Sequence, residues 1–296
     1  MIQNVIRQNV GLYADTISNS DNLDGSLHGK LNYLTGELTG LYGGTYQVTA
    51  NLTITANTTM TVLSGVYKDV TINDGFTLSA LAPAIYLIAD TITLGAGSII
   101  SASGKGASGG AAKTTAATGN IGTDAPDSIA GQGGGGGSGS TYNGGVAGAN
   151  KIFNVVPVVY TVAPNGNSSA IQAIKNQQLY PQCFIGSGGG GGAAQTTSST
   201  GGAGGAGGGL VVLCCRVLTF GAGSAINAAG INGSNATGTT ASGGGGGGGG
   251  TVIISTHQII GTPSVSVAGG SGGSKVGSNV YNGGAGGAGC NIRVRW

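Results

Sequence analysis

A run of eight glycines stands directly before a strand-forming segment in this 296-residue chain. In the stretch ASGGGGGGGGTVIIST (residues 241–256), the glycines are followed at once by residues that favour strands. Glycine loses more conformational freedom on folding than any other residue. Two structures fit: a flexible linker beside a strand, or an ordered glycine segment packed against others. The choice constrains the whole fold, because glycine tracts recur. The other tracts lie near residues 104–110, 131–139, 186–192, 201–209, 269–273 and 283–289.

Composition favours a collapsed chain over a disordered one. Glycine supplies 65 residues, charged residues only 7%, and apolar residues 39%. Disordered chains normally combine high charge with few apolar residues, whereas the formal net charge here is +2. Charge repulsion therefore does not keep the chain expanded, and we expect it to collapse or to assemble.

The same composition excludes several classes of partner. The scattered Lys and Arg residues form no phosphate-binding stripe, so we expect no nucleic acid partner. No stretch of about 18 apolar residues predicts insertion into a membrane. The first residues, MIQNVIRQNVGLY, lack the apolar core of a signal peptide. We therefore expect the protein to stay where it is made or to leave the cell by a route other than ordinary secretion, of which assembly into a virus particle is one.

Internal repeats predict the arrangement of strands. Residues 85–104 and 211–230 align without a gap at an offset of 126, and a third copy at 252–269 needs one deletion. Each copy reads as a strand, a glycine-containing turn, a short strand and a glycine tract. Residues 45–89 show alternating apolar positions with turn signals about every 20 residues. This pattern predicts the rungs of a parallel β-solenoid, with a β-sandwich as the alternative.

The fold class that we predict is all-β, with almost no α-helix. It combines β-solenoid-like rungs with a packed bundle of polyglycine-II helices. The one candidate helix is SSAIQAIKNQQL, residues 168–179, which is followed by Pro181.

Alanines at three-residue spacing favour the ordered bundle. Ala203 and Ala206 are three residues apart in one tract, and Ala285 and Ala288 in another. A polyproline-II helix has three residues per turn, so these alanines form one ridge and leave bare glycine elsewhere. Such helices make no internal hydrogen bonds, and buried tracts must therefore pair their backbone groups with neighbouring tracts. A side chain at Gly246 is expected to force the helices apart, unless the tract is a flexible linker.

Glycine tract, apolar strand, GAGS turn, second strand and renewed glycine tract follow one another from Tyr46 to Trp296. This succession resembles the glycine-rich domains of tailed-bacteriophage proteins, and is similar to tail-fibre tip adhesins. The resemblance implies receptor contacts on loops that join packed polyglycine-II helices, and attachment to a fibre through the N-terminal part. The chain departs from that plan in its strand-rich N-terminal half and in an insert.

We divide the chain into three regions. Residues 1–40 are an attachment or assembly segment, residues 41–110 a β-solenoid-like region, and residues 111–296 a glycine-rich domain with an insert at 147–185. The expected partners are other virion proteins, through the N-terminal region, and a host surface protein or glycan. The oligomeric state stays open.

Tyrosines beside the tracts are the candidate receptor-binding residues. The tetrapeptide YNGG occurs twice, once with Tyr142 and Asn143 and once with Tyr281 and Asn282. A tyrosine offers a rigid amphipathic surface for recognition, but it also suits a cap over glycine backbone. The insert supplies two weaker candidates of the same kind, Tyr160 and Tyr180.

Catalytic motifs are weak in this chain. The two Gly-Lys pairs lack the Ser or Thr of a P-loop, so no nucleotide is expected. Asp69 and Asp90 lie about one predicted rung apart and are candidates for a glycosidase pair, although Asp69 and Asp74 also suit turns. His28 and His257 stand in no Ser-His-Asp pattern. We therefore predict no catalytic residue, metal ligand or cofactor.

Four cysteines occur, two of them adjacent (Cys214 and Cys215). Small buried thiols in a reducing compartment are the favoured interpretation, with a disulfide through Cys183 or Cys290 as the alternative.

The function expected from these features is that of a non-enzymatic virion protein, assembled in the host cytoplasm, that presents loops to a host surface. The alternatives are a capsid decoration or baseplate protein, a polysaccharide depolymerase spike, and an ice-binding or cell-wall protein.

Overall fold

The computed structural model describes residues 51–60, 64–81, 83–122, 130–148, 160–162 and 184–295. Residues Ala50–Trp296 form one compact unit. The expected attachment segment, the candidate helix, Tyr180 and most of the insert lie outside the described residues.

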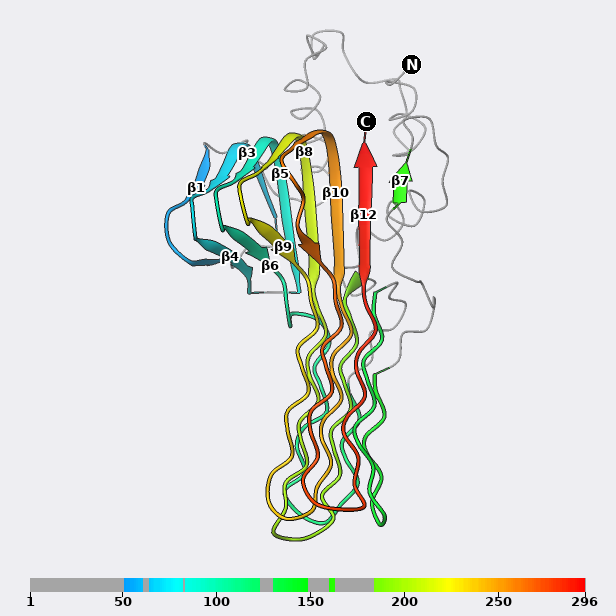
Figure 1. Ribbon diagram of the computed structural model, residues 1–296. Helices are drawn as coiled ribbons and strands as arrows, with labels where there is room; N and C mark the ends of the chain where they lie inside the picture. Colours follow the sequence, from blue (N-terminus) through cyan, green and yellow to red (C-terminus); the bar gives the residue numbers. More distant parts are fainter. Residues whose placement is uncertain are drawn as a thin grey trace, which may run out of the picture. The chain divides into compact units, whose positions relative to one another are not determined.

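The described strands form two parallel sheets (Figure 1), which confirms the all-β class. The larger sheet has the strand order β1-β3-β5-β8-β10-β12-β7, and the smaller sheet the order β11-β9-β6-β4-β2. No α-helix occurs in the part of the chain that the structure describes. The strands are β1 (Leu52–Ile54), β2 (Thr58–Met60), β3 (Ser64–Ile72), β4 (Thr77–Ala80), β5 (Ala84–Leu94), β6 (Ile99–Ser101), β7 (Tyr160–Val162), β8 (Leu210–Phe220), β9 (Ala225–Asn227), β10 (Thr251–Ile260), β11 (Val265–Ser266) and β12 (Cys290–Arg295).

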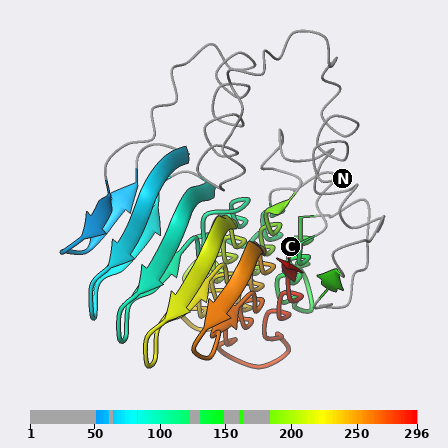
Figure 2. The same ribbon diagram turned by 90° about the horizontal axis from the view of Figure 1, so that it is seen from above.

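The spacing of the sequence repeat equals the offset between paired residues in both sheets. Ile85 of β5 lies opposite Val211 of β8, at the offset of 126 residues that relates the two aligned copies. Strands β6 and β9 pair at the same offset, since Ile99 lies opposite Ala225. Figure 2 shows the successive strand-turn-strand units side by side in chain order, from β1 in blue to β10 in orange.

The third copy is shorter than the others, and the structure places the difference in its turn. Strands β8 and β10 pair at an offset of 41 residues, whereas β9 and β11 pair at 39. The two offsets differ because four residues separate the paired positions Ile260 and Val265, whereas six separate their partners Thr219 and Ile226. The deletion thus lies between the two strands and leaves both pairings intact.

Turns between the two sheets stack in the same way. Gly75, Gly97 and Gly223 have φ angles of 74°, 65° and 70°, which glycine adopts more readily than other residues. The N–H of Gly75 donates to the carbonyl oxygen of Ala96, and that of Gly97 to Ala222, so each turn is hydrogen-bonded to the next.

The largest apolar core lies along the strands, and its burial pattern changes within β5 and β8. Ile85 and Leu87 are buried at odd-numbered positions of β5, but Ile92 and Leu94 are buried at even-numbered ones. The change occurs at Asp90 in β5 and at Arg216 in β8. Charged residues therefore stand where the inward-facing positions of the strand switch.

Beyond the sheets the glycine tracts run side by side (Figure 1), and they are hydrogen-bonded to one another. Residues 243–250, the central tract, donate every N–H to a neighbouring segment of the chain, and the same neighbour recurs every third residue. The acceptors are Tyr281, Gly284 and Gly287 for Gly243, Gly246 and Gly249; Ser234, Ile231 and Ala228 for Gly244, Gly247 and Gly250; and Gly190 and Ser187 for Gly245 and Gly248. All of these donors lie on glycine, and none of the acceptors lies within the central tract.

The carbonyl oxygens of the central tract are paired as well, again in rotation. Three further segments donate to them: residues 131–137, residues 205–208 and residues 270–273, with Cys290 donating to Gly250. The central tract is therefore enclosed by hydrogen-bonded chain on all sides. A Cβ atom added at any of its glycines would overlap the backbone of a neighbouring tract.

A second tract, residues 186–192, is enclosed in the same manner. It bonds to the central tract, to residues 106–110 and 202–208, to residues 131–137, and to the segments around Asn120 and Gly145. These two inner tracts contain no alanine, whereas tracts that carry alanines, such as residues 201–209 and 283–289, lie around them. The packing thus explains why the two inner tracts are glycine over their enclosed length, apart from the small buried Ser187.

The described cysteines are free thiols. Burial raises the pKa of Cys215 to about 12 and that of Cys290 to about 11, and it also raises the pKa of Cys214. Cys215 and Cys290 are thus small buried side chains, Cys214 is half-buried, and Cys183 lies outside the described residues. In the described part of the chain, no helix is long and apolar enough to cross a membrane.

Candidate functional site

Loops at the ends of the glycine tracts, opposite the sheets, form the candidate site (Figure 1). We call them the tip loops: residues 111–117, 139–143, 194–200, 235–241 and 274–282. Isolated β-bridges tie them to one another, pairing Ala117 with Ala194, Ala194 with Ala241, Ala241 with Val276, Gly139 with Val280 and Thr200 with Thr237. The loops therefore form one connected surface.

Three of the tip loops stack closely on one another. Gly238 and Gly277 occupy the same turn position in successive loops, with φ angles of 91° and 88°. A Cβ atom at Gly238 would overlap the carbonyl oxygen of Ser198, and one at Gly277 that of Thr239. The turns thus need glycine both for backbone conformation and for close approach.

Hydroxyl groups join the first two stacked loops. Ser199 is buried, and its Oγ lies 2.7 Å from Thr196 Oγ1 and 3.2 Å from Thr239 Oγ1. The same oxygen accepts hydrogen bonds from the N–H groups of Thr239 and Thr240 at 3.2 and 2.9 Å. Ser199 therefore holds the loops together, while Ser198 and Thr239 remain exposed on the outer surface.

The two YNGG tetrapeptides are both hydrogen-bonded to the peptide group between Ser138 and Gly139. Tyr281 donates its N–H to the carbonyl oxygen of Ser138 at 2.9 Å, and the N–H of Gly139 donates to the carbonyl oxygen of Tyr142 at 2.9 Å. Tyr281 is 66% exposed and Tyr142 is half-buried. The structure thus brings together the two tyrosines that the sequence singles out.

The asparagines of the two tetrapeptides are exposed at the same place. The Oδ1 atom of Asn282 accepts a 2.9 Å hydrogen bond from the N–H of Lys275, within the same loop. The backbone carbonyl of Asn143 accepts a 2.9 Å hydrogen bond from Gly119.

Sequence reasoning missed Gln195. Its Oε1 accepts hydrogen bonds from the N–H groups of Thr141 and Tyr142 at 2.9 and 3.1 Å, and its Nε2 donates to the carbonyl oxygen of Tyr142 at 3.0 Å. One side chain therefore fixes the turn that carries Tyr142. A lone glutamine in a polar loop carries no local signal for a bond to residues more than 50 positions away.

The other predicted residues lie elsewhere. Tyr160 begins β7, which pairs with β12 at the edge of the larger sheet. Ala203 and Ala206 are half-buried along one tract, and Ala285 and Ala288 are exposed along another. Gly246, in the central tract, is buried.

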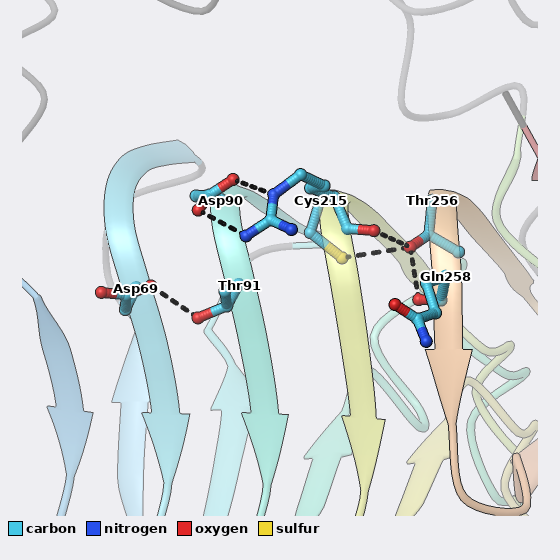
Figure 3. Close-up of polar contacts among 7 residues, drawn as sticks. Asp69, Asp90, Thr91, Cys215, Thr256 and Gln258 are labelled. Atoms are coloured by element: carbon cyan, nitrogen blue, oxygen red, sulfur yellow. Dashed lines mark hydrogen bonds and ion pairs between the residues drawn. The ribbon is translucent and has the colours of Figure 1, made fainter. Parts of the chain in front are cut away.

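Figure 3 shows polar contacts of the two candidate carboxylates, Asp69 and Asp90. Asp90 forms a two-pronged ion pair with Arg216, at 2.8 Å to Nε and 3.1 Å to Nη2. The hydrogen bonds that Arg216 donates to the carboxylate of Asp90 raise the pKa of Arg216. Asp69 accepts a 2.5 Å hydrogen bond from Thr91. Asp90 is thus bonded to Arg216 and Asp69 to Thr91.

The alternative interpretation of the aspartates as turn formers is right for Asp74 and wrong for Asp69. Asp74 lies in a turn and accepts a 2.8 Å hydrogen bond from the N–H of Ala96, whereas Asp69 lies within β3. Among the residues that the structure describes, no group of three His, Cys, Asp or Glu side chains is placed to hold a metal ion.

No family model, curated protein or solved structure matches the chain.

Proposed function

We propose that this chain is a non-enzymatic virion protein of a tailed phage, a tail-fibre or spike adhesin that presents the tip loops to a receptor on a host surface. The observation that carries the proposal is the pairing of the central tract, whose N–H and C=O groups all bond to other tracts. No backbone N–H or C=O group of the central tract is left unpaired, so the tract cannot shift without breaking hydrogen bonds. The loops at its end are therefore held in fixed positions.

The finer description of the fold belongs to this proposal. We assign the glycine tracts as polyglycine-II helices, because hydrogen bonds to any one neighbour recur every third residue, as a helix of three residues per turn requires. We assign the paired sheets as a parallel β-solenoid, since each strand-turn-strand unit stacks in register on the previous one.

The two parts have complementary roles in this scheme. Burial of apolar strand residues supplies the hydrophobic stabilisation, which is about 1.5–3 kcal/mol for each fully buried Leu or Ile. Glycine tracts bury almost no side-chain surface and lose backbone entropy when they are fixed. The sheets thus fix where each tract begins, and the tracts extend that order to the tip loops.

Exposed polar loops suit presentation to a receptor. The tip loops combine hydroxyls, amides and two tyrosines on a surface whose backbone is fixed by hydrogen bonds. A fixed loop loses less conformational entropy on binding, so more of its contact energy becomes affinity.

Labelling of particles tests the proposal. Antibodies against the tip-loop peptide 274–282 should decorate a fibre or spike end in negative-stain images of the source phage. The purified chain should also compete with the phage for adsorption to its host bacteria. Antibody density over the capsid shell or the baseplate, without competition, would replace the adhesin by a decoration or baseplate protein. Release of reducing ends from host polysaccharide by the purified chain would contradict the non-enzymatic part.

A further inference from the structure

We propose that the tip binds a polysaccharide, with the side chains of Tyr142 and Tyr281 stacking on sugar rings and with Gln195 as the positioning residue for Tyr142. This inference rests on the proposed function, because it names the chemical class of the receptor.

The spacing of the two tyrosines suits consecutive sugar rings. The carbonyl of Ser138 and the N–H of Gly139 belong to one trans peptide, so they point in opposite directions, toward Tyr281 and Tyr142 respectively. Hydrogen-bonded neighbouring chains lie about 4.8 Å apart, which separates the two tyrosine-bearing segments by about 10 Å. Two aromatic side chains at this separation can each support one ring of an extended sugar chain.

A tyrosine matches both faces of sugar chemistry. The C–H bonds of a pyranose ring form an apolar surface that packs on an aromatic face, while the phenol O–H reaches sugar hydroxyls. Tyr281 is 66% exposed, so its ring is available for such contact. Exposed amide and hydroxyl side chains of the tip loops, from Asn143, Asn282 and Thr239, supply both donors and acceptors, as sugar hydroxyls require.

The same loops are poorly suited to a protein partner. Strong protein interfaces depend on clustered Trp, Tyr and Arg anchors that become fully buried. All residues of the tip loops are described, and among them Tyr281 is the one large apolar or aromatic side chain that is exposed. These loops contain no arginine. They also contain Lys113 and Lys275 but no acidic residue, which is compatible with neutral polysaccharides and favours acidic ones.

Gln195 contributes through the position of Tyr142. Its three hydrogen bonds hold the backbone on both sides of Tyr142, and they come from a separate loop. Without them the tyrosine must be ordered when the ligand binds, and affinity falls. Gln195→Glu keeps the two acceptor contacts and loses the donor, so it should recover part of the affinity that Gln195→Ala loses.

The experiment uses the full chain on the host bacteria of the source phage and on an array of bacterial surface polysaccharides. Binding to bacteria should survive proteinase K and be lost after periodate, which cleaves the vicinal diols of sugars. Tyr281→Ala and Tyr142→Ala should each weaken binding about tenfold or more, because an aromatic contact and its buried surface are removed. Val146→Ala is the matched control, since Val146 is 68% exposed beside the same tracts, and its binding should not change.

Two results would overturn the inference. Binding that survives periodate but is lost with proteinase K means a protein receptor, and it leaves the adhesin proposal standing. Equal binding by Tyr281→Ala and the unaltered chain removes the tyrosine site. Conversely, sugar binding on the array by a chain that neither labels the particle nor competes for adsorption contradicts the proposed function and leaves the polysaccharide site in place.

Discussion

The amide of Gly246 donates a 2.9 Å hydrogen bond to the carbonyl oxygen of Gly284, across the boundary between the central tract and an outer one. A Cβ atom at Gly246 would overlap the backbone of Gly270 and Ser271 on a different neighbour. Gly135, on an outer tract, differs: it is exposed, and no atom lies within 4 Å of a Cβ added there. Comparing Gly246 with Gly135 therefore distinguishes a glycine that close packing requires from one that it does not.

The first prediction compares substitutions at these two glycines. Gly246→Val should abolish soluble folded protein, and Gly246→Ala should cost more than about 4 kcal/mol of unfolding free energy, because backbone must move apart. Gly135→Ala should stabilise by about 0.4–1 kcal/mol, since alanine restricts the unfolded chain. Urea unfolding of the soluble variants measures both. Normal folding of Gly246→Val would contradict an enclosed central tract.

The second prediction concerns amide exchange in the central tract. Every N–H from Gly243 to Gly250 donates to another tract, so these amides should exchange only through unfolding of the bundle. Protection should approach that of β10, which follows directly. Amides at the exposed turn residue Ser278 should exchange far faster. Mass spectrometry of deuterated peptides measures this, and exchange of the tract within seconds beside a protected β10 would make the tract a linker.

Much of the strand arrangement could be predicted from the sequence, because repeats of apolar residues carry register directly. The offset of 126 residues between the aligned copies is the offset at which Leu87 lies opposite Leu213. The third copy, which aligns with one deletion, likewise predicted that β10 pairs with β8. It did not predict that the deletion lies in the turn, where the offset between paired residues falls from 41 to 39.

The interior of the bundle could be predicted less well. Glycine composition is nearly the same in enclosed and outer tracts, and only the missing alanines distinguish residues 243–250 from 283–289. The pairing of Tyr142 with Tyr281 was also hidden, because it depends on which tracts are neighbours. Gln195 bonds across loops that are distant in sequence, and no periodic pattern records such a contact.

The third prediction tests the core that the repeat defines. Leu213 is fully buried in β8, so Leu213→Ala should lower the free energy of unfolding by about 2–5 kcal/mol through lost burial and a cavity. Arg216→Ala, three residues away, removes an ion pair whose side chains are 46% and 32% exposed, and exposed pairs contribute little. Its effect on the urea midpoint should be much smaller. Equal effects of the two variants would place the stabilisation in the ion pair instead.

The fourth prediction uses the pH dependence of a buried thiol. The folded-state pKa of Cys215 is raised from 9.0 to about 12 by burial, so the folded protein keeps the thiol protonated where the unfolded chain loses its proton. The stabilisation is complete below pH 9 and is lost as the pH rises toward 12. Its slope is about 1.4 kcal/mol per pH unit, because one proton fewer is bound in the unfolded state.

Cys215→Ala isolates this contribution from the other groups that titrate at high pH. The variant is less stable throughout, since it leaves a small cavity, but its unfolding free energy should fall less steeply between pH 9 and 12 than that of the unaltered chain. Cys290→Ala is a matched comparison, with a pKa raised only to about 11, so its effect on the slope should end about one pH unit earlier. Identical slopes for Cys215→Ala and the unaltered chain would mean that the Cys215 thiol ionises without unfolding, which its 2% exposure opposes.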